Sequence, residues 1–224
     1  MAKSAVLRTF GRHWLKPLTF WLLALPGLWL IWQWGLLLSG MPNRLGFNPI
    51  ETTHHFLGDT ALRILLVTLA VTPFRDITRW LPIMKVRRRI GLAAFWYAFA
   101  HVAAYLGLDL FIAAGMSLPG MLAGLWEDVA KRIYITLGMV AFILLIPLAV
   151  TSFNTAIRAL GPQLWQRIHW AIYPLAILAV LHHGFMEKGN QPGPWIHGAI
   201  LAILLGYRLV RTARRRSQPK PSAS

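Results

Sequence analysis

Long apolar stretches alternate with short basic ones along almost the whole chain. A helix needs about 20 mostly apolar residues to cross the hydrocarbon core of a bilayer. Lipid offers no hydrogen-bond partner to backbone groups, so a single segment that crosses the bilayer must be helical. The sequence therefore predicts an all-α integral membrane protein, a bundle of six transmembrane helices. The six predicted spans are residues 18–38, 56–74, 90–112, 132–151, 168–186 and 194–210.

Two of these stretches carry features that refine the prediction. The second contains Asp59 and Arg63, four positions apart, where the two charges can pair on one helix face. The first directly follows a basic segment and is too long for the apolar region of a signal peptide, so we expect it to stay as a membrane helix. Residues 1–211 form the predicted membrane domain, and residues 212–224 are predicted to be a disordered basic cytoplasmic tail.

Basic residues gather on one side of the predicted bundle, with eighteen there against four on the other. Cytoplasmic loops are enriched in Lys and Arg, so we expect both termini in the cytoplasm and the protein in the bacterial inner membrane. The net charge of +16 then reflects topology and contact with the anionic head groups of the lipid bilayer, and we expect no nucleic-acid partner. The eighteen are Lys3, Arg8, Arg12, Lys16, Arg75, Arg79, Lys85, Arg87, Arg88, Arg89, Arg158, Arg167, Arg208, Arg211, Arg214, Arg215, Arg216 and Lys220; the four are Arg44, Lys131, Arg132 and Lys188.

The composition also limits the chemistry. Only 13% of the residues are charged, against about 25% in soluble domains, which leaves no room for a separate soluble domain. The chain has no cysteine, which excludes disulfides, thiolate metal sites and covalently attached c-type haem. Histidine is therefore the main candidate metal ligand.

Three histidines lie inside predicted spans: His101 in the third, His169 and His182 in the fifth. Ionisable side chains within a membrane are costly and usually face the bundle interior. Neutral imidazole is a good ligand for haem iron, and two rings from facing helices can hold one haem between them. Hydrogen-bonded packing histidines remain the alternative. Small residues that leave room for a macrocycle surround His101, namely Ala94, Ala98, Ala100, Ala103 and Ala104.

Depth in the bilayer suggests which histidines share a haem. His169 and His182 are 13 residues apart and would not share a face of an ideal helix, although Pro174 between them can kink it. Counted from Arg89 and Arg167 at about 1.5 Å per residue, His101 lies about 18 Å deep, His169 about 3 Å and His182 about 22 Å. We predict one haem held by His101 and His182 in the outer half. His169 then serves a second haem or lies beside the site of electron uptake.

Weaker candidates accompany these three. His183 competes with its neighbour His182, since one residue rotates a side chain by about 100°. His55, next to His54 at the start of the second span, is a candidate ligand or proton-handling group. Arg87, Arg88 and Arg89 mark topology and lipid contact, with the further hypothesis that they help an anionic flavin or a haem propionate to dock. His13 and His197 are interpreted as interfacial or helix-end residues.

A set of short segments carries a family resemblance. The segments HHFLGDTALR, VTPFR, RRRIGLAAFWYAFAHVAAY, LAVTS and WQRIHWAIYPLAILAVLHH occur in this order and cover roughly residues 26–186. Together they resemble the ferric-reductase-type transmembrane domain of NADPH oxidases and ferric reductases. Within that superfamily the sequence is most similar to the MsrQ (YedZ) family, the haem-binding membrane subunits of the periplasmic methionine sulfoxide reductase system.

The resemblance implies cofactors and partners. It implies non-covalent haem b, one or two per chain, with His101, His169 and His182 as ligands, and favours His182 over His183. It also implies electrons from quinol, an associated FMN, a cytosolic flavin reductase, and a periplasmic molybdopterin catalytic subunit. The third span has only His101 where the oxidases have two histidines, which puts two bis-histidine haems in doubt. The sequence shows no counterpart of the flavin and nicotinamide domain of the oxidases, so we expect a separate electron donor.

The sequence therefore predicts a haem b electron-transfer subunit, not the sulfoxide-reducing catalytic subunit. It would pass electrons from the quinone pool to a periplasmic enzyme that repairs oxidised proteins. Two alternatives stay open: a proton-coupled transporter that uses its intramembrane histidines as relays, and a transmembrane ferric reductase that needs no protein partner.

Overall fold

The computed structural model describes residues 14–187 and 191–217, and all regular elements within them are helical. Six of the helical stretches are long and apolar enough to cross a membrane, which confirms the predicted fold class. Residues His13, Lys3, Arg8, Arg12, Lys188, Lys220 and the rest of the predicted tail beyond Ser217 lie outside the described residues. The elements are α2 (Leu15–Leu38), α3 (Pro49–Thr78), η1 (Leu81–Ile83), α4 (Met84–Ala104), η2 (Tyr105–Phe111), α5 (Leu118–Lys131), α6 (Ile133–Val150), α7 (Asn154–His169), α8 (Ile172–Met186) and α9 (Pro192–Arg216).

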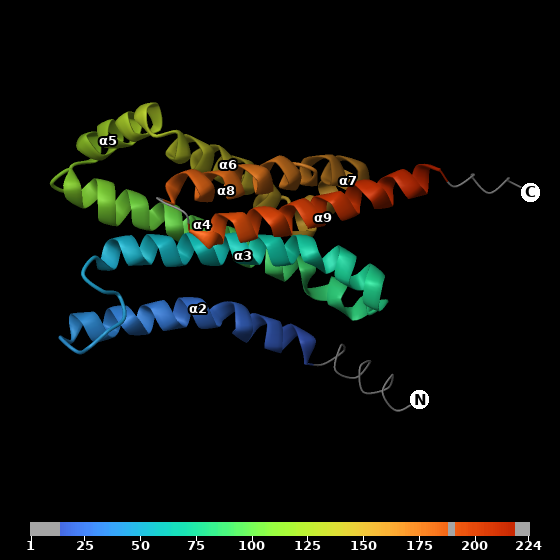
Figure 1. Cartoon of the computed structure of the whole chain (residues 1–224), viewed down its shortest axis with the longest axis horizontal. Helices are drawn as coiled ribbons and strands as arrows, with labels where there is room; N and C mark the ends of the chain where they lie inside the picture. The colour runs from blue at the N-terminus through green and yellow to red at the C-terminus, as the bar shows by residue number, and fades with distance from the viewer. Residues whose placement is uncertain (1–13, 188–190, 218–224) are drawn as a thin grey trace, which may run out of the picture.

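The long helices run back and forth along one axis, with α2 on one side, α3 and α9 in the middle and α6 with α8 on the other side (Figure 1). The start of α2 and the end of α9 lie at the same end of the bundle as η1 and α7. We call this the basic end, since Arg87, Arg88 and Arg89 lie in the first turns of α4 there. The opposite end carries α5, and we call it the α5 end.

Helix α3 forms the centre of the core. Asn48 caps its start by accepting a hydrogen bond from the Glu51 N–H at 3.2 Å, and Pro49 occupies the first turn, where no N–H is needed. Leu69 of α3 is fully buried, as are Leu175 and Ala176 of α8. The buried apolar residues of α3 therefore give the other helices a common packing surface.

At the basic end, Arg208 of α9 compensates for a backbone hydrogen bond that Pro73 of α3 cannot make. Pro73 inside α3 has no N–H to give to the carbonyl of Leu69, four residues earlier. Arg208 of α9 supplies the missing donor: its Nη2 donates to the Leu69 oxygen at 2.8 Å and its Nη1 to the Tyr173 hydroxyl at 3.1 Å. The guanidinium also lies 5.4 Å from the Tyr173 ring centroid. These contacts explain an arginine inside a membrane helix.

Tyr97 of α4 connects its helix to α2 next to Pro26. Its hydroxyl accepts from the Gly27 N–H at 2.8 Å and donates to the Leu23 oxygen at 2.7 Å. In an uninterrupted helix those two backbone groups would bond each other. The tyrosine therefore bridges both groups of one turn of α2 and fixes that turn against α4.

Three local features differ from the sequence prediction. The fifth span is not one helix over 168–186: α7 ends at His169 and α8 begins at Ile172, because Pro174 has no N–H for the carbonyl of Trp170. The third span does not stay α-helical, since residues Tyr105–Phe111 form a π-helix. Residues 113–131, between the third and fourth predicted spans, contain α5. This 14-residue helix has exposed apolar residues at four-residue spacing, at Leu118, Leu122 and Trp126.

Candidate functional site

His101 of α4 and His182 of α8 face each other across the bundle. Their ring centroids are 6.2 Å apart, with an angle of 73° between the ring planes. A metal held between two imidazoles lies about 2 Å from each nitrogen, so the two ring centroids of such a pair are separated by about 6 Å. The spacing therefore fits one iron ion between the two rings.

Both rings form a hydrogen bond through Nδ1 to a backbone carbonyl of a neighbouring helix. His101 Nδ1 lies 3.0 Å from the carbonyl oxygen of His54 on α3, and His182 Nδ1 lies 2.6 Å from that of Tyr134 on α6. A carbonyl oxygen only accepts, so each Nδ1 carries the proton and each Nε2 keeps its lone pair. A hydrogen bond from Nδ1 to a carbonyl is the contact that orients metal-binding histidines and leaves Nε2 for the metal.

A cavity of about 270 Å³ opens between α3, α4, α6 and α8, and both histidines line it. Its walls differ from one end to the other. Apolar side chains suit the body of a macrocycle, and the polar groups suit its carboxylates. Toward the α5 end the lining includes Glu51, His54, Tyr105, Asp109 and Arg132, and toward the basic end it includes Ala61, Leu65, Ala98, Leu145 and Leu175.

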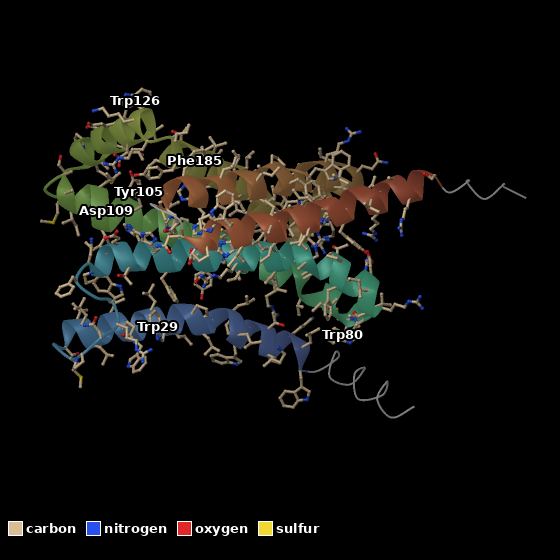
Figure 2. The ribbon with its side chains drawn as sticks, viewed as in Figure 1. Trp29, Trp80, Tyr105, Asp109, Trp126 and Phe185 are labelled. Carbon is tan, nitrogen blue, oxygen red and sulfur yellow. The ribbon has the colours of Figure 1, made fainter. Side chains whose placement is uncertain are left out.

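Charged contacts hold the rim of the cavity at the α5 end, where Tyr105 and Asp109 lie (Figure 2). Tyr105 donates to Asp128 Oδ2 at 2.5 Å, and Asp128 Oδ1 lies 3.2 Å from Arg132 Nε. The carboxylate of Asp128 raises the pKa of the Arg132 guanidinium, so this arginine stays charged. His54 Nδ1 lies 3.2 Å from Asp109 Oδ2 on the π-helix. The π-helix thus brings Tyr105 and Asp109 to the mouth of the cavity.

Comparison with known proteins identifies the family. A family model described as "Ferric reductase like transmembrane component" matches residues 57–180. The haem-binding subunit MsrQ of a protein-methionine-sulfoxide reductase from Xanthomonas euvesicatoria pv. vesicatoria is 41% identical over 197 residues, 85% of this chain and 86% of that protein. The subunit of the same name from Rhodospirillum rubrum is 42% identical over 187 residues, 84% of this chain and 85% of that protein. The chain belongs to the MsrQ family. The resemblance found in the sequence is confirmed.

His183 of this MsrQ family member also lines the cavity, but its ring faces Asp59 and His197 instead of His101. Its Nδ1 lies 3.6 Å from Asp59 Oδ1, and its ring centroid is 5.1 Å from that of His197. Asp59 also accepts a hydrogen bond from Arg63 at 2.7 Å, as the spacing of these residues predicts. His183 Nε2 and His197 Nδ1 are buried and have no hydrogen-bond partner among the described residues. Of the two adjacent histidines, only His182 is paired with His101.

His169 lies outside the cavity. Its Nδ1 is 3.0 Å from the carbonyl oxygen of Trp165, one turn earlier in α7, and its ring stacks on the Trp165 indole at 3.9 Å between centroids. Trp165 is fixed in turn by donating to the Thr151 oxygen at 3.0 Å. The structure thus brings His101 and His182 together and leaves His169 toward the basic end.

The remaining predicted site residues are His55, which also lines the cavity, and the basic run Arg87, Arg88 and Arg89, which does not. His55 lies between two carboxylates, with Nε2 3.9 Å from Glu51 and Nδ1 3.9 Å from Glu187. Within the basic run, Arg88 donates to the Asn154 side chain and Arg89 to the Lys16 carbonyl. Arg87 has no acidic partner among the described residues.

Sequence reasoning missed three contributors to the site. The carbonyls of His54 and Tyr134 carry no side-chain signal and become visible only through packing. Asp109 stands near the end of a predicted span, where a lone carboxylate is unusual, and this signal could have marked the mouth of the cavity.

Proposed function

We propose that this protein is a haem b electron-transfer subunit of a methionine sulfoxide reductase system. The observation that carries the proposal is the pair of His101 and His182, held by two different helices on one cavity. The printed names of the relatives, haem-binding subunits of such a system, support it. Haem b bound there would supply one-electron ferric/ferrous chemistry within the membrane.

The side chains of this protein have separate roles in that site. His101 and His182 would ligate the iron through Nε2, while the carbonyls of His54 and Tyr134 keep the Nδ1 protons in place. Ala94, Ala98 and Leu175 line the cavity and would keep water from the bound haem. Arg132 is the lining cation at the α5 end and would pair with a haem carboxylate.

We propose the direction of electron flow from the charge distribution. The basic end would lie in the cytoplasm and the α5 end in the periplasm, in the bacterial inner membrane. Electrons would come from quinol, or from a cytosolic flavin reductase through FMN, and leave to a periplasmic molybdopterin catalytic subunit. His169 near the basic end would ligate a second haem or line the site of electron uptake.

Absorption spectra of the purified full-length protein test this function. We expect a Soret band that shifts on dithionite reduction, reduction of the same haem by a quinol, and no methionine sulfoxide turnover by the protein alone. A colourless protein would support the transporter alternative instead. Rapid reduction of a ferric chelate without any protein partner would favour the ferric reductase alternative.

Reporter fusions test the orientation separately. A reporter after Arg211 and a second one within residues 113–130 should report opposite sides of the membrane, the first cytoplasmic. A periplasmic signal from the C-terminal fusion would reverse the proposed direction.

A further inference from the structure

The same local arrangement holds both cavity histidines. His101 Nδ1 meets the carbonyl of His54, and the residue four positions after His54 is Gly58. His182 Nδ1 meets the carbonyl of Tyr134, and the residue four positions after Tyr134 is Gly138. Two unrelated helices, α3 and α6, thus present a carbonyl and a glycine at the same spacing to a ring from a neighbouring helix.

Helix geometry explains this spacing. A helical carbonyl accepts from the N–H four residues later and keeps a second lone pair free. The side chain of that later residue leans toward the N-terminus and covers the preceding turn. A Cβ on that residue would therefore crowd a flat ring that approaches the carbonyl, whereas glycine leaves room for the ring.

The distances confirm that the space is used. A Cβ added to Gly138 would lie 2.7 Å from His182 Nδ1 and 2.8 Å from Cε1. A Cβ added to Gly58 would lie 3.3 Å from both Nδ1 and Cε1 of His101. By contrast, a Cβ added to Gly206 of α9 would meet nothing within 4 Å.

We infer that Gly58 and Gly138 are positioning residues for the haem. By exposing the carbonyls of His54 and Tyr134, they set the direction of each imidazole and keep Nε2 toward the cavity. The inference rests on the proposed function. The inference also predicts a larger effect at Gly138 than at Gly58. His182 cannot turn away from a Cβ at position 138 without losing its hydrogen bond. At position 58, a shift of the His101 ring by a few tenths of an ångström is enough.

Three alanine variants of the full-length protein test the inference: Gly138→Ala, Gly58→Ala and the control Gly206→Ala. The readouts are haem content, the low-spin signal in absorption and electron paramagnetic resonance spectra, and the midpoint potential. We expect Gly138→Ala to lose the low-spin haem or convert it to high spin. Gly58→Ala should keep the haem at a higher potential, because a weaker Nδ1 hydrogen bond makes the ligand less basic. Gly206→Ala should match the wild type.

The outcomes separate the two proposals. A wild-type protein without haem would sink the proposed function itself. A wild type with low-spin haem, together with unchanged spectra and potentials in Gly138→Ala and Gly58→Ala, would overturn only the inference. If Gly138→Ala fails to accumulate in the membrane, Gly58→Ala decides: a raised potential supports the inference, and an unchanged one contradicts it.

Discussion

His101 and His182 on one side and His169 on the other show two ways to keep a histidine inside a membrane protein. The cavity rings are fixed by carbonyls of other helices, α3 and α6, and both lie on an open space. The His169 ring bonds a carbonyl of its own helix and stacks on Trp165. Both arrangements leave Nε2 with its lone pair. The first needs the assembled bundle and places the ring on a cavity, whereas the second needs only a single turn of helix.

The difference separates ligand candidates that look alike in sequence. All three histidines are polar residues in apolar surroundings, and the family resemblance treats them together. The structure distinguishes them by which helix satisfies Nδ1. We therefore expect substitutions at the cavity pair to act together and those at His169 to act alone.

The largest expected effect is the loss of haem from the cavity pair. His101→Ala and His182→Ala should each lose the same low-spin haem, because either change would remove one of the two proposed ligands to one iron. His169→Ala should keep that haem, since its ring lies outside the cavity. Haem content and reduced-minus-oxidised spectra of the three purified variants measure this.

One result would reverse the assignment. If His101→Ala and His169→Ala lose the same haem while His182→Ala keeps it, the pairing seen in the structure does not hold a cofactor. His183→Asn serves as a matched control beside His182, because its ring faces Asp59 and His197 instead of His101.

A smaller effect is expected from Arg208 at the basic end. Arg208→Met should lower the free energy of unfolding by about 1–3 kcal/mol, because the buried carbonyl of Leu69 loses its donor. The haem spectrum should not change, since Arg208 does not line the cavity. Thermal denaturation in detergent gives the first quantity. A variant as stable as the wild type would mean that another group donates a hydrogen bond to the Leu69 carbonyl.

Arg87 tests whether the basic end receives electrons. The neighbouring arginines bond Asn154 and the Lys16 carbonyl, whereas Arg87 has no acidic partner among the described residues. If an anionic donor docks there, Arg87→Gln should slow haem reduction about tenfold, within the range of electrostatic steering. Arg88→Gln is the matched control and should change the rate little. Equal rates for the two variants and the wild type would mean that the three arginines serve only membrane topology and lipid contact.

The sequence predicts those parts of the molecule that depend on composition and spacing. Apolar length predicts six spans, the spacing of Asp59 and Arg63 predicts their ion pair, and depth places His101 level with His182. It does not predict the carbonyls that hold the two rings, because these depend on which helices become neighbours. It also misses the π-helix at Tyr105–Phe111 and the helix α5. With 14 residues, α5 is too short to be found by a search for membrane-spanning stretches.

Tyr97→Phe should give the smallest effect, and it tests how far the cavity depends on the outer helix α2. Tyr97 lies one turn before His101 on α4, and its hydroxyl separates the Gly27 N–H from the Leu23 carbonyl. Without the hydroxyl, these two groups are four residues apart and can bond each other, so little is left unsatisfied. We expect a loss of about 0.5–1 kcal/mol in unfolding free energy and an unchanged haem spectrum. Loss of low-spin haem in this variant, measured beside Arg208→Met, would show that α2 positions His101 through α4 instead of only bracing the bundle from outside.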